Sequence, residues 1–301
     1  MRKDEISMSK EYVFPKSVAE AVEILAKNHG KARIISGGTD LMVNLANETV
    51  KAEVLVDVTR IEGFNDIEFD NGLVIMHAGI TMAEVAAHQR IISGVGALAM
   101  AAVSMGSPQI RNAATLAGNI ISAQPAADAA VMLAALGAEI TVRGQAGVRI
   151  IAVEDAYAGL GQSVIDPGAE IVVKITFKEL LKHQGSAFVR LAHRKALALP
   201  ILNVGVMLSV NSGIIEWARI VMAPVDIKPA RAMEAECFLA GLAPTEDVFK
   251  QAGALAVKYA QPRDSLIRGS AKYRLAVLPS LVARALAESA REIAIKGGRI
   301  A

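Results

Sequence analysis

The chain has 301 residues, of which 53% are hydrophobic, and a mean hydropathy of +0.38. This length supports two domains with sizeable cores, while the apolar runs are far shorter than the roughly 18 to 20 residues that a membrane span needs. Thirty-two basic and 30 acidic residues leave a formal charge of +2, and the basic residues are scattered rather than clustered. We therefore expect a globular protein with no membrane span and no nucleic-acid partner.

The N-terminal segment and the cysteine content narrow the location and the redox chemistry. Residues 1–15 mix charged side chains and contain no apolar core of a secretory signal, which favours a cytoplasmic location. Cys237 is the single cysteine, so the chain forms no internal disulfide and cannot by itself supply the four protein ligands that an iron-sulfur cluster normally takes. Any redox role must therefore use another cofactor.

The first 60 residues alternate helix and strand. Ser17 and Glu20 have the spacing of a capping box, which predicts a helix that ends at Gly30. The other elements expected here are strands at 33–36 and 54–59, a turn at 37–40, and a helix or an extended wall at 41–47.

The next 120 residues mix helices with strands that can pair antiparallel. Asn71-Gly72 favours a tight hairpin turn between strands 67–69 and 73–76, and Thr81 with Glu84 forms a second capping-box pattern. Further elements are expected as helices at 94–105 and 126–136 and strands at 139–143, 148–153 and 170–177. Because the order lacks the regular period of a doubly wound sheet, an α+β fold is predicted.

The polar segment 178–185 is a candidate domain boundary. Beyond it the pattern predicts roughly three antiparallel strands, at 187–191, 204–210 and 214–222, followed by helices. In the last helical run, Pro279 predicts a kink or a split into two helices.

Two short glycine-bearing loops carry the main functional signal, at residues 34–41 and 114–120. Each has small residues where backbone N–H groups could approach phosphate oxygens, and two separated anion-binding turns fit one pyrophosphate. The window from Val85 to Ala127 contains no acidic residue, which an anionic ligand would tolerate. The loops therefore indicate a dinucleotide, and specifically a flavin.

Two other patterns have a simpler interpretation. Residues 94–99 match G-x-G-x-x-A, but the acidic residue expected about 20 positions later is absent, so we interpret this segment as helix packing. The five histidines have no metal-ligand spacing, and no metal site is predicted.

Several motifs in order carry a resemblance to a known family. They are S-G-G-T-D-L at 36–41, Q-I-R-N-A-A-T-L-A-G-N at 109–119, Q-P-A-A-D at 124–128, and matches at 185–188, 193–196, 203–205 and 273–274. Over nearly its whole length the chain resembles the FAD-binding medium subunit of molybdenum hydroxylases, the family of xanthine dehydrogenase and aerobic carbon monoxide dehydrogenase.

The resemblance implies a two-lobed FAD-binding domain of the vanillyl-alcohol-oxidase (PCMH) type at 1–180, with lobes at about 1–60 and 61–180. A small C-terminal α+β domain with a three-stranded antiparallel sheet would follow at 185–301. FAD would lie between the lobes, bound noncovalently because neither loop contains a histidine.

The resemblance also implies the cofactor-binding residues. Residues 35–40 would hold the pyrophosphate, Asp128 would bind ribityl or ribose hydroxyls, and Met105 and Gly106 would approach the isoalloxazine. The complete set is Ile35, Ser36, Gly37, Gly38, Thr39, Asp40, Met105, Gly106, Thr115, Ala117, Gly118, Asn119, Asp128 and Arg190. The chain departs from the family pattern at Ala117, Gln124, His77 and His193, none of which removes a backbone donor.

The function implied is electron transfer. A large partner subunit would oxidise the substrate at a molybdenum cofactor, a small partner with [2Fe-2S] clusters would pass electrons on, and FAD in this chain would deliver them to NAD or another acceptor, within a dimer of heterotrimers. No side chain of this chain is then needed as a catalytic acid or base. The alternatives are a stand-alone flavin reductase similar to UDP-N-acetylenolpyruvoylglucosamine reductase and a flavin-free assembly subunit.

Overall fold

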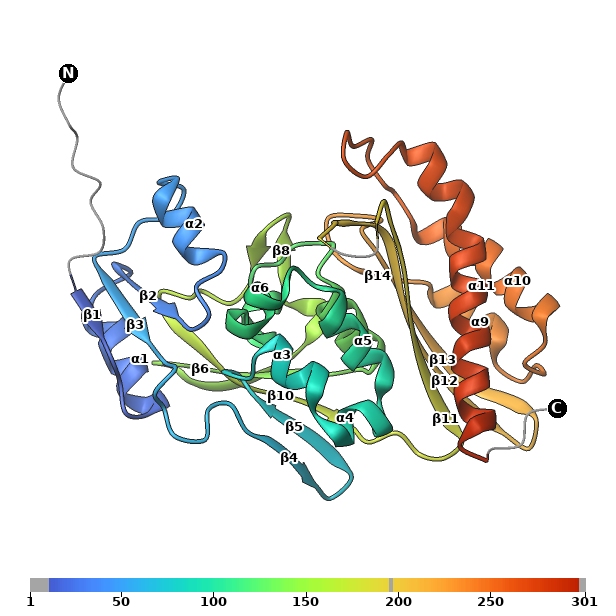
Figure 1. Cartoon of the computed structure of the whole chain (residues 1–301), viewed down its shortest axis with the longest axis horizontal. Coiled ribbons are helices and arrows are strands. Elements are labelled where there is room, and N and C mark those ends of the chain that lie inside the picture. Colours follow the sequence, from blue (N-terminus) through green and yellow to red (C-terminus); the bar gives the residue numbers. More distant parts are fainter. Residues whose placement is uncertain (1–10, 195–196, 298–301) are drawn as a thin grey trace.

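The computed structural model describes residues 11–194 and 197–297. The molecule is elongated, and three sheets follow one another along its long axis in chain order, from the blue N-terminal part to the orange and red C-terminal part (Figure 1). The α+β class predicted from the sequence is confirmed. No helix in the described ranges is long and apolar enough to cross a membrane.

The first sheet contains three parallel strands in the order β1 (Glu11–Val13), β3 (Val54–Asp57), β2 (Ala32–Ile35). Helix α1 (Val18–Lys27) connects β1 to β2, and α2 (Leu41–Ala46) follows β2. The hydroxyl of Ser17 accepts a hydrogen bond from the N–H of Glu20, as the capping box predicts. The carboxylate of Glu20, however, accepts from the N–H of Lys16 instead of returning to Ser17, so the box is only half formed.

The central sheet contains five strands in the order β4 (Ile67–Asp70), β5 (Leu73–His77), β10 (Glu170–Lys178), β6 (Glu139–Gly144), β7 (Gly147–Ala152). All neighbours are antiparallel. The predicted turn between β4 and β5 is confirmed: Asn71 and Gly72 have φ of 49° and 75°, the positive pair that a two-residue hairpin turn requires. A short hairpin, β8 (Tyr157–Gly159) and β9 (Gln162–Ser163), follows η1 (Val153–Asp155).

Six helices lie between β5 and β6 in the chain: α3 (Met82–Ala87), α4 (Gln89–Gly94), α5 (Gly96–Ser104), α6 (Pro108–Ala113), α7 (Leu116–Ile121) and α8 (Asp128–Ala135). Every residue of α8 is buried, because it packs against α5 on one side and against β12 and β13 of the third sheet on the other. The G-x-G-x-x-A segment lies where α4 ends and α5 begins, in keeping with its interpretation as helix packing.

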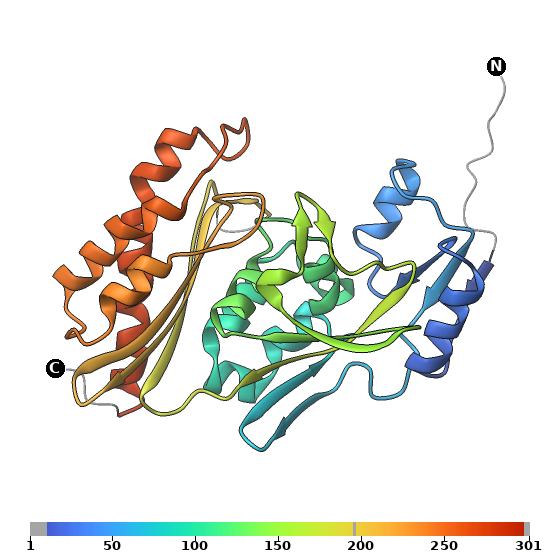
Figure 2. The same cartoon turned by 180° about the vertical axis from the view of Figure 1, so that it is seen from behind.

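The third sheet contains β11 (Gln184–Ala192), β12 (Pro200–Asn211), β13 (Ile214–Ala223) and β14 (Ala230–Arg231) in that order. The three long antiparallel strands were predicted, and β14 was missed because two residues carry no sequence periodicity. Helices α9 (Met233–Leu239), α10 (Glu246–Ala256) and α11 (Ala271–Ile295), with η2 (Val257–Tyr259), cover its outer face (Figure 2).

Of the kink or split predicted at Pro279, the split does not occur, because α11 continues through the proline. Proline inside a helix costs about 3 kcal/mol, whereas each fully buried Leu or Val contributes about 1.5 to 3 kcal/mol, and α11 buries Leu278, Val282 and Leu286 among others. Gly253 of α10 makes room at this point, since a Cβ there would lie 2.3 Å from the carbonyl oxygen of Pro279.

Two hydrophobic cores meet at the third sheet. The inner core fills the first two sheets and their helices, and it includes Phe188, Met207 and Val221 from the third sheet. The outer core lies between that sheet and α9 to α11. The C-terminal sheet is therefore packed on both faces.

Candidate functional site

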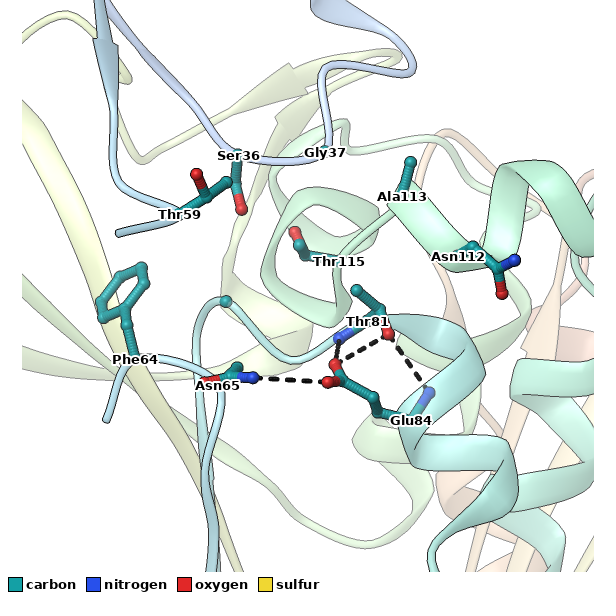
Figure 3. A pocket seen from close by; sticks show the side chains of 11 residues that line it. Ser36, Gly37, Thr59, Phe64, Asn65, Thr81, Glu84, Asn112, Ala113 and Thr115 are labelled. Atoms are coloured by element: carbon teal, nitrogen blue, oxygen red, sulfur yellow. Dashed lines mark hydrogen bonds between the residues drawn. The ribbon is translucent and has the colours of Figure 1, made fainter. Parts of the chain in front are cut away.

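A cavity of about 350 Å³ lies where the first glycine loop meets the segment that leads into α7 (Figure 3). The first loop lines it with Ser36 and Gly37, and the second segment with Asn112, Ala113 and Thr115. The remaining lining residues are Thr59, Phe64, Asn65, Gly79, Thr81 and Glu84. The cavity thus joins the two sequence regions predicted to form one binding site.

Backbone pairing fixes the second segment beside α3. The N–H of Met82 donates to the carbonyl of Ala114 at 2.9 Å, and the N–H of Leu116 donates to the carbonyl of Ile80 at 2.9 Å. Both strands of this short bridge then enter helices, α3 capped by Thr81 and α7 capped by Thr115. The two helices therefore begin side by side at the cavity.

Gly37 brings the first loop into direct contact with this segment. A Cβ atom on Gly37 would lie 1.9 Å from the carbonyl oxygen of Ala113 and 2.6 Å from its carbonyl carbon. Contacts this short are impossible, and the obstacle is backbone rather than a mobile side chain. Only glycine lets the two loops approach this closely.

The first loop also presents free hydrogen-bond donors. Among the described residues, none of the backbone N–H groups of residues 36–40 donates a hydrogen bond. Gly38 has φ of 66°, so the loop turns through the left-handed region between β2 and α2. A run of backbone N–H groups at a turn of this kind is a common way to bind phosphate. The loop therefore fits the anionic part of a dinucleotide.

The second segment has few donors left. The N–H of Gly118 donates to Oγ1 of Thr115 at 3.1 Å, which is the N-cap of α7. The side chain of Asn119 accepts from the N–H of Ala130 at 3.3 Å and so connects α7 to α8. Of the predicted residues in this segment, Thr115 alone lines the cavity, whereas Ala117 is buried in the inner core.

Among the described residues that line the cavity, Glu84 is the one with a carboxylate. Its Oε2 accepts from both the N–H and the hydroxyl of Thr81, each at 2.8 Å, and its Oε1 accepts from Nδ2 of Asn65 at 3.3 Å (Figure 3). The capping box was predicted from the sequence, but its place at the cavity was not. Phe64 and Asn65 also line the cavity, and no sequence motif predicted either of them.

Asp57 at the end of β3 fixes Thr59 at the cavity edge. Its Oδ1 accepts from the N–H and the hydroxyl of Thr59 at 2.8 and 2.6 Å, and its Oδ2 accepts from the hydroxyl of Tyr12 at 2.8 Å. Burial, together with the hydrogen bond to Asp57, raises the pKa of Tyr12 to about 12. In the sequence, Thr59 is only the last residue of the predicted strand 54–59, and no sequence signal placed it beside the first loop.

Met105 and Gly106 form the turn between α5 and α6, outside the cavity lining. The guanidinium of Arg111 donates to both of their carbonyls, at 3.0 and 3.4 Å. This holds the turn rigidly on the α6 side of the site.

Asp128 and Arg190 are brought together, but they are not part of the cavity lining. The carboxylate of Asp128, on α8, accepts from Nε of Arg190 at 3.2 Å and from Nδ2 of Asn203 at 2.6 Å. Asp128 and Arg190 side chains are 4% and 11% exposed, and burial raises the pKa of Asp128 while Arg190 opposes that rise. This network links α8 to β11 and β12. Asn203, which belongs to one of the matching motifs, was not predicted as a site residue.

Comparisons with known proteins agree with this architecture. Residues 6–177 match the family described as the FAD binding domain in molybdopterin dehydrogenase, and residues 187–289 match the CO dehydrogenase flavoprotein C-terminal domain. The nicotinate dehydrogenase FAD-subunit of Eubacterium barkeri is 29% identical, over 77% of this chain and 79% of that protein.

Two further similarities cover almost the full length. The carbon monoxide dehydrogenase medium chain of Hydrogenophaga pseudoflava is 26% identical, over 92% of this chain and 95% of that one. In a crystal structure of Cu,Mo-CO dehydrogenase, one chain superposes with a TM-score of 0.88 at 28% identity, covering 95% of this chain and 99% of that chain. The chain therefore belongs to the family of FAD-binding medium subunits of molybdenum hydroxylases, and its cofactor is FAD.

Proposed function

We propose that this chain holds FAD noncovalently with the pyrophosphate on the backbone N–H groups of residues 36–40, and that it carries electrons from the iron-sulfur clusters of a partner to NAD or another acceptor. The observation that carries the proposal is the run of free donors beside a cavity. When bound, FAD supplies the exchange of electrons one at a time with clusters and in pairs with a nicotinamide.

The protein's own contribution is binding and orientation. Ser36 to Asp40 supply the donors and Ile35 leads into them from β2. Thr115, Ala117, Gly118 and Asn119 form the opposite wall and its support. Asp128 with Arg190 is assigned to the ribityl or ribose side and Met105 with Gly106 to the isoalloxazine side. None of these residues acts as a catalytic acid or base.

The assembly we propose contains a large molybdenum-cofactor subunit and a small [2Fe-2S] subunit, arranged as a dimer of heterotrimers in the cytoplasm. Relatives are named as a medium chain and as a FAD-subunit, which supports a heteromeric assembly. Within this chain, we assign residues 1–180 to the FAD-binding domain, with lobes at about 1–60 and 61–180, and residues 185–301 to the C-terminal domain.

The test combines flavin release with turnover. Acid precipitation of the purified chain should release a yellow, FAD-containing supernatant, and a yellow pellet would contradict noncovalent binding. The isolated chain is expected to reduce a dye slowly with NADH and to oxidise neither purines nor aldehydes. Oxidation of such a substrate by this polypeptide alone, free of molybdenum and iron, would refute the subunit assignment.

A further inference from the structure

Three arginines come together where the loop before α11 folds back onto the first turn of that helix. Ser265 and Gly269 form a backbone bridge across the loop, and the N–H of Arg268 donates to Oγ of Ser265 at 3.2 Å. The guanidinium of Arg274, in the helix, donates to the carbonyl of Arg263 at the start of the loop. These contacts hold Arg263, Arg268 and Arg274 in one region, which we call the arginine cluster.

The arginine cluster has little negative charge to balance it. Segment 261–274 contains four Arg or Lys residues and one acidic residue, Asp264, whose carboxylate accepts from the N–H of Ala271 at 2.7 Å. None of the three guanidiniums forms an ion pair within the part of the chain that the structure describes. The first turn of α11 contains no acidic residue, and the positive end of the helix dipole adds to the excess of positive charge there.

Arg274 is the buried member of the cluster, with 4% of its surface exposed. Its Nη1 donates to the carbonyl of Pro224 at 2.8 Å and its Nη2 to that of Arg263, whereas its Nε is buried and has no partner among the described residues. Burial, followed by the charge of Arg268, lowers the pKa of Arg274. Because an unpaired donor on a buried cation costs free energy, an acceptor that reached this Nε would stabilise the charged group.

Arg268 has its whole guanidinium available. Within the described ranges this group donates no hydrogen bond, and its Nε is buried without a partner. Burial lowers the pKa of Arg268, and no neighbouring carboxylate opposes the change. Since the side chain is only partly buried, a ligand from solvent can reach it. The cluster therefore offers unused donors on two neighbouring guanidiniums, one deeply buried and one accessible.

We propose that Arg268 and Arg274 bind a phosphate group at the start of α11, carried by inorganic phosphate or by a nucleotide. The planar fork of a guanidinium matches the oxygens of phosphate, and a dianion balances two guanidinium charges, whereas a carboxylate balances one. Neither arginine is among the residues assigned to FAD, which are expected to bind its pyrophosphate through backbone N–H groups. The ligand of the arginine cluster is thus additional to the cofactor.

The test measures the affinity of the FAD-loaded chain for inorganic phosphate by isothermal titration calorimetry at constant ionic strength, with adenosine monophosphate and acetate as the other probes. Arg268→Gln should weaken phosphate binding at least about tenfold, because it removes hydrogen bonds from a charged donor, and Arg268→Lys should weaken it less. Lys272→Gln is the matched control, since it removes one positive charge from an exposed position in the same helical turn. It should weaken binding by less than about threefold. Flavin content and thermal unfolding check that each variant folds.

Each outcome supports or overturns the site. Saturable binding of phosphate or adenosine monophosphate that Arg268→Gln weakens supports it, and the tighter of the two probes shows whether the phosphate is free or carried by a nucleotide. The proposal is refuted if neither probe binds, if acetate binds as tightly as phosphate, or if Arg268→Gln binds no more weakly than Lys272→Gln. Binding to the flavin-free chain alone would also overturn it, because the arginines would then hold the phosphate of the cofactor itself.

Discussion

The two glycine segments look alike in sequence but differ in what they offer a ligand. At residues 36–40 the backbone N–H groups are free among the described partners, and Gly37 touches the Ala113 carbonyl so closely that no other residue fits. At Gly118 the N–H already bonds to Thr115, and an added Cβ would meet only the Oγ1 of Thr115, at 3.0 Å. The first segment therefore offers hydrogen-bond donors to a ligand. The second segment mainly forms the opposite side of the cavity, against which the first segment packs.

The largest effect on the difference between the two segments is expected from Gly37→Ala. The new Cβ must displace the Ala113 backbone, which we expect to cost about 3 kcal/mol and to lower FAD affinity at least tenfold by separating the loops. The measurement is the flavin-to-polypeptide ratio after gel filtration, with thermal unfolding beside it. Gly94→Ala is the control because a Cβ there meets nothing within 4 Å. Full flavin content in Gly37→Ala would mean that the contact between the loops is unimportant.

Local chemistry allowed part of the cavity lining to be predicted, namely Ser36, Gly37 and Thr115. The capping boxes, the Asn-Gly hairpin and the small residues of the first loop each act within a few positions, so a sequence pattern carries them. The matching motifs likewise located both segments.

What sequence could not provide depends on contacts between distant residues. Position 37 must be glycine because the backbone of Ala113 lies against it, not because a ligand does. Ala113 is held there by the pairing of residues 80–82 with 114–116, and no local sequence pattern encodes that pairing. The positions of Phe64 and Asn65 at the cavity wall also depend on contacts between distant residues. So does the hydrogen bond from Asn203 to Asp128. At Pro279 the local signal also allowed a split between two helices, which the packing of α11 prevents.

The support behind the second segment can be tested through Asp128. Asp128→Asn removes the charge from the side chain that Arg190 and Asn203 share, leaving a nearly buried guanidinium unpaired. We expect the free energy of unfolding to fall by about 3 kcal/mol. Glu288→Gln, which breaks an exposed pair with Arg284 on α11, should cost no more than about 0.5 kcal/mol. Equal losses in the two variants, measured by urea unfolding, would contradict a structural role for the buried network.

A smaller effect is expected from Gly118→Ala. The Cβ would push Oγ1 of Thr115 away from its N–H partner, which amounts to losing an N-cap worth about 1 kcal/mol. FAD affinity should fall less than tenfold, far less than in Gly37→Ala, as measured by flavin titration of the apoprotein. Complete loss of flavin would show instead that Gly118 itself lies against the cofactor, and the contrast between the segments would disappear.

The smallest effect is expected from Tyr12, whose hydroxyl donates a hydrogen bond to Asp57 beside the first segment. Burial, then the bond to Asp57, raises the pKa of Tyr12 from 10.0 to about 12, so the folded state keeps this proton longer than the unfolded state does. The resulting stabilisation is complete below pH 10 and is lost as the pH rises toward 12. Since Tyr12 is nearly half exposed, solvent limits it to less than about 1 kcal/mol. Tyr12→Phe should therefore reduce the alkaline fall in unfolding free energy relative to the wild-type chain. An unchanged alkaline fall in Tyr12→Phe would mean that the bond to Asp57 is not held in solution, and Thr59 would then lose part of its support at the cavity edge.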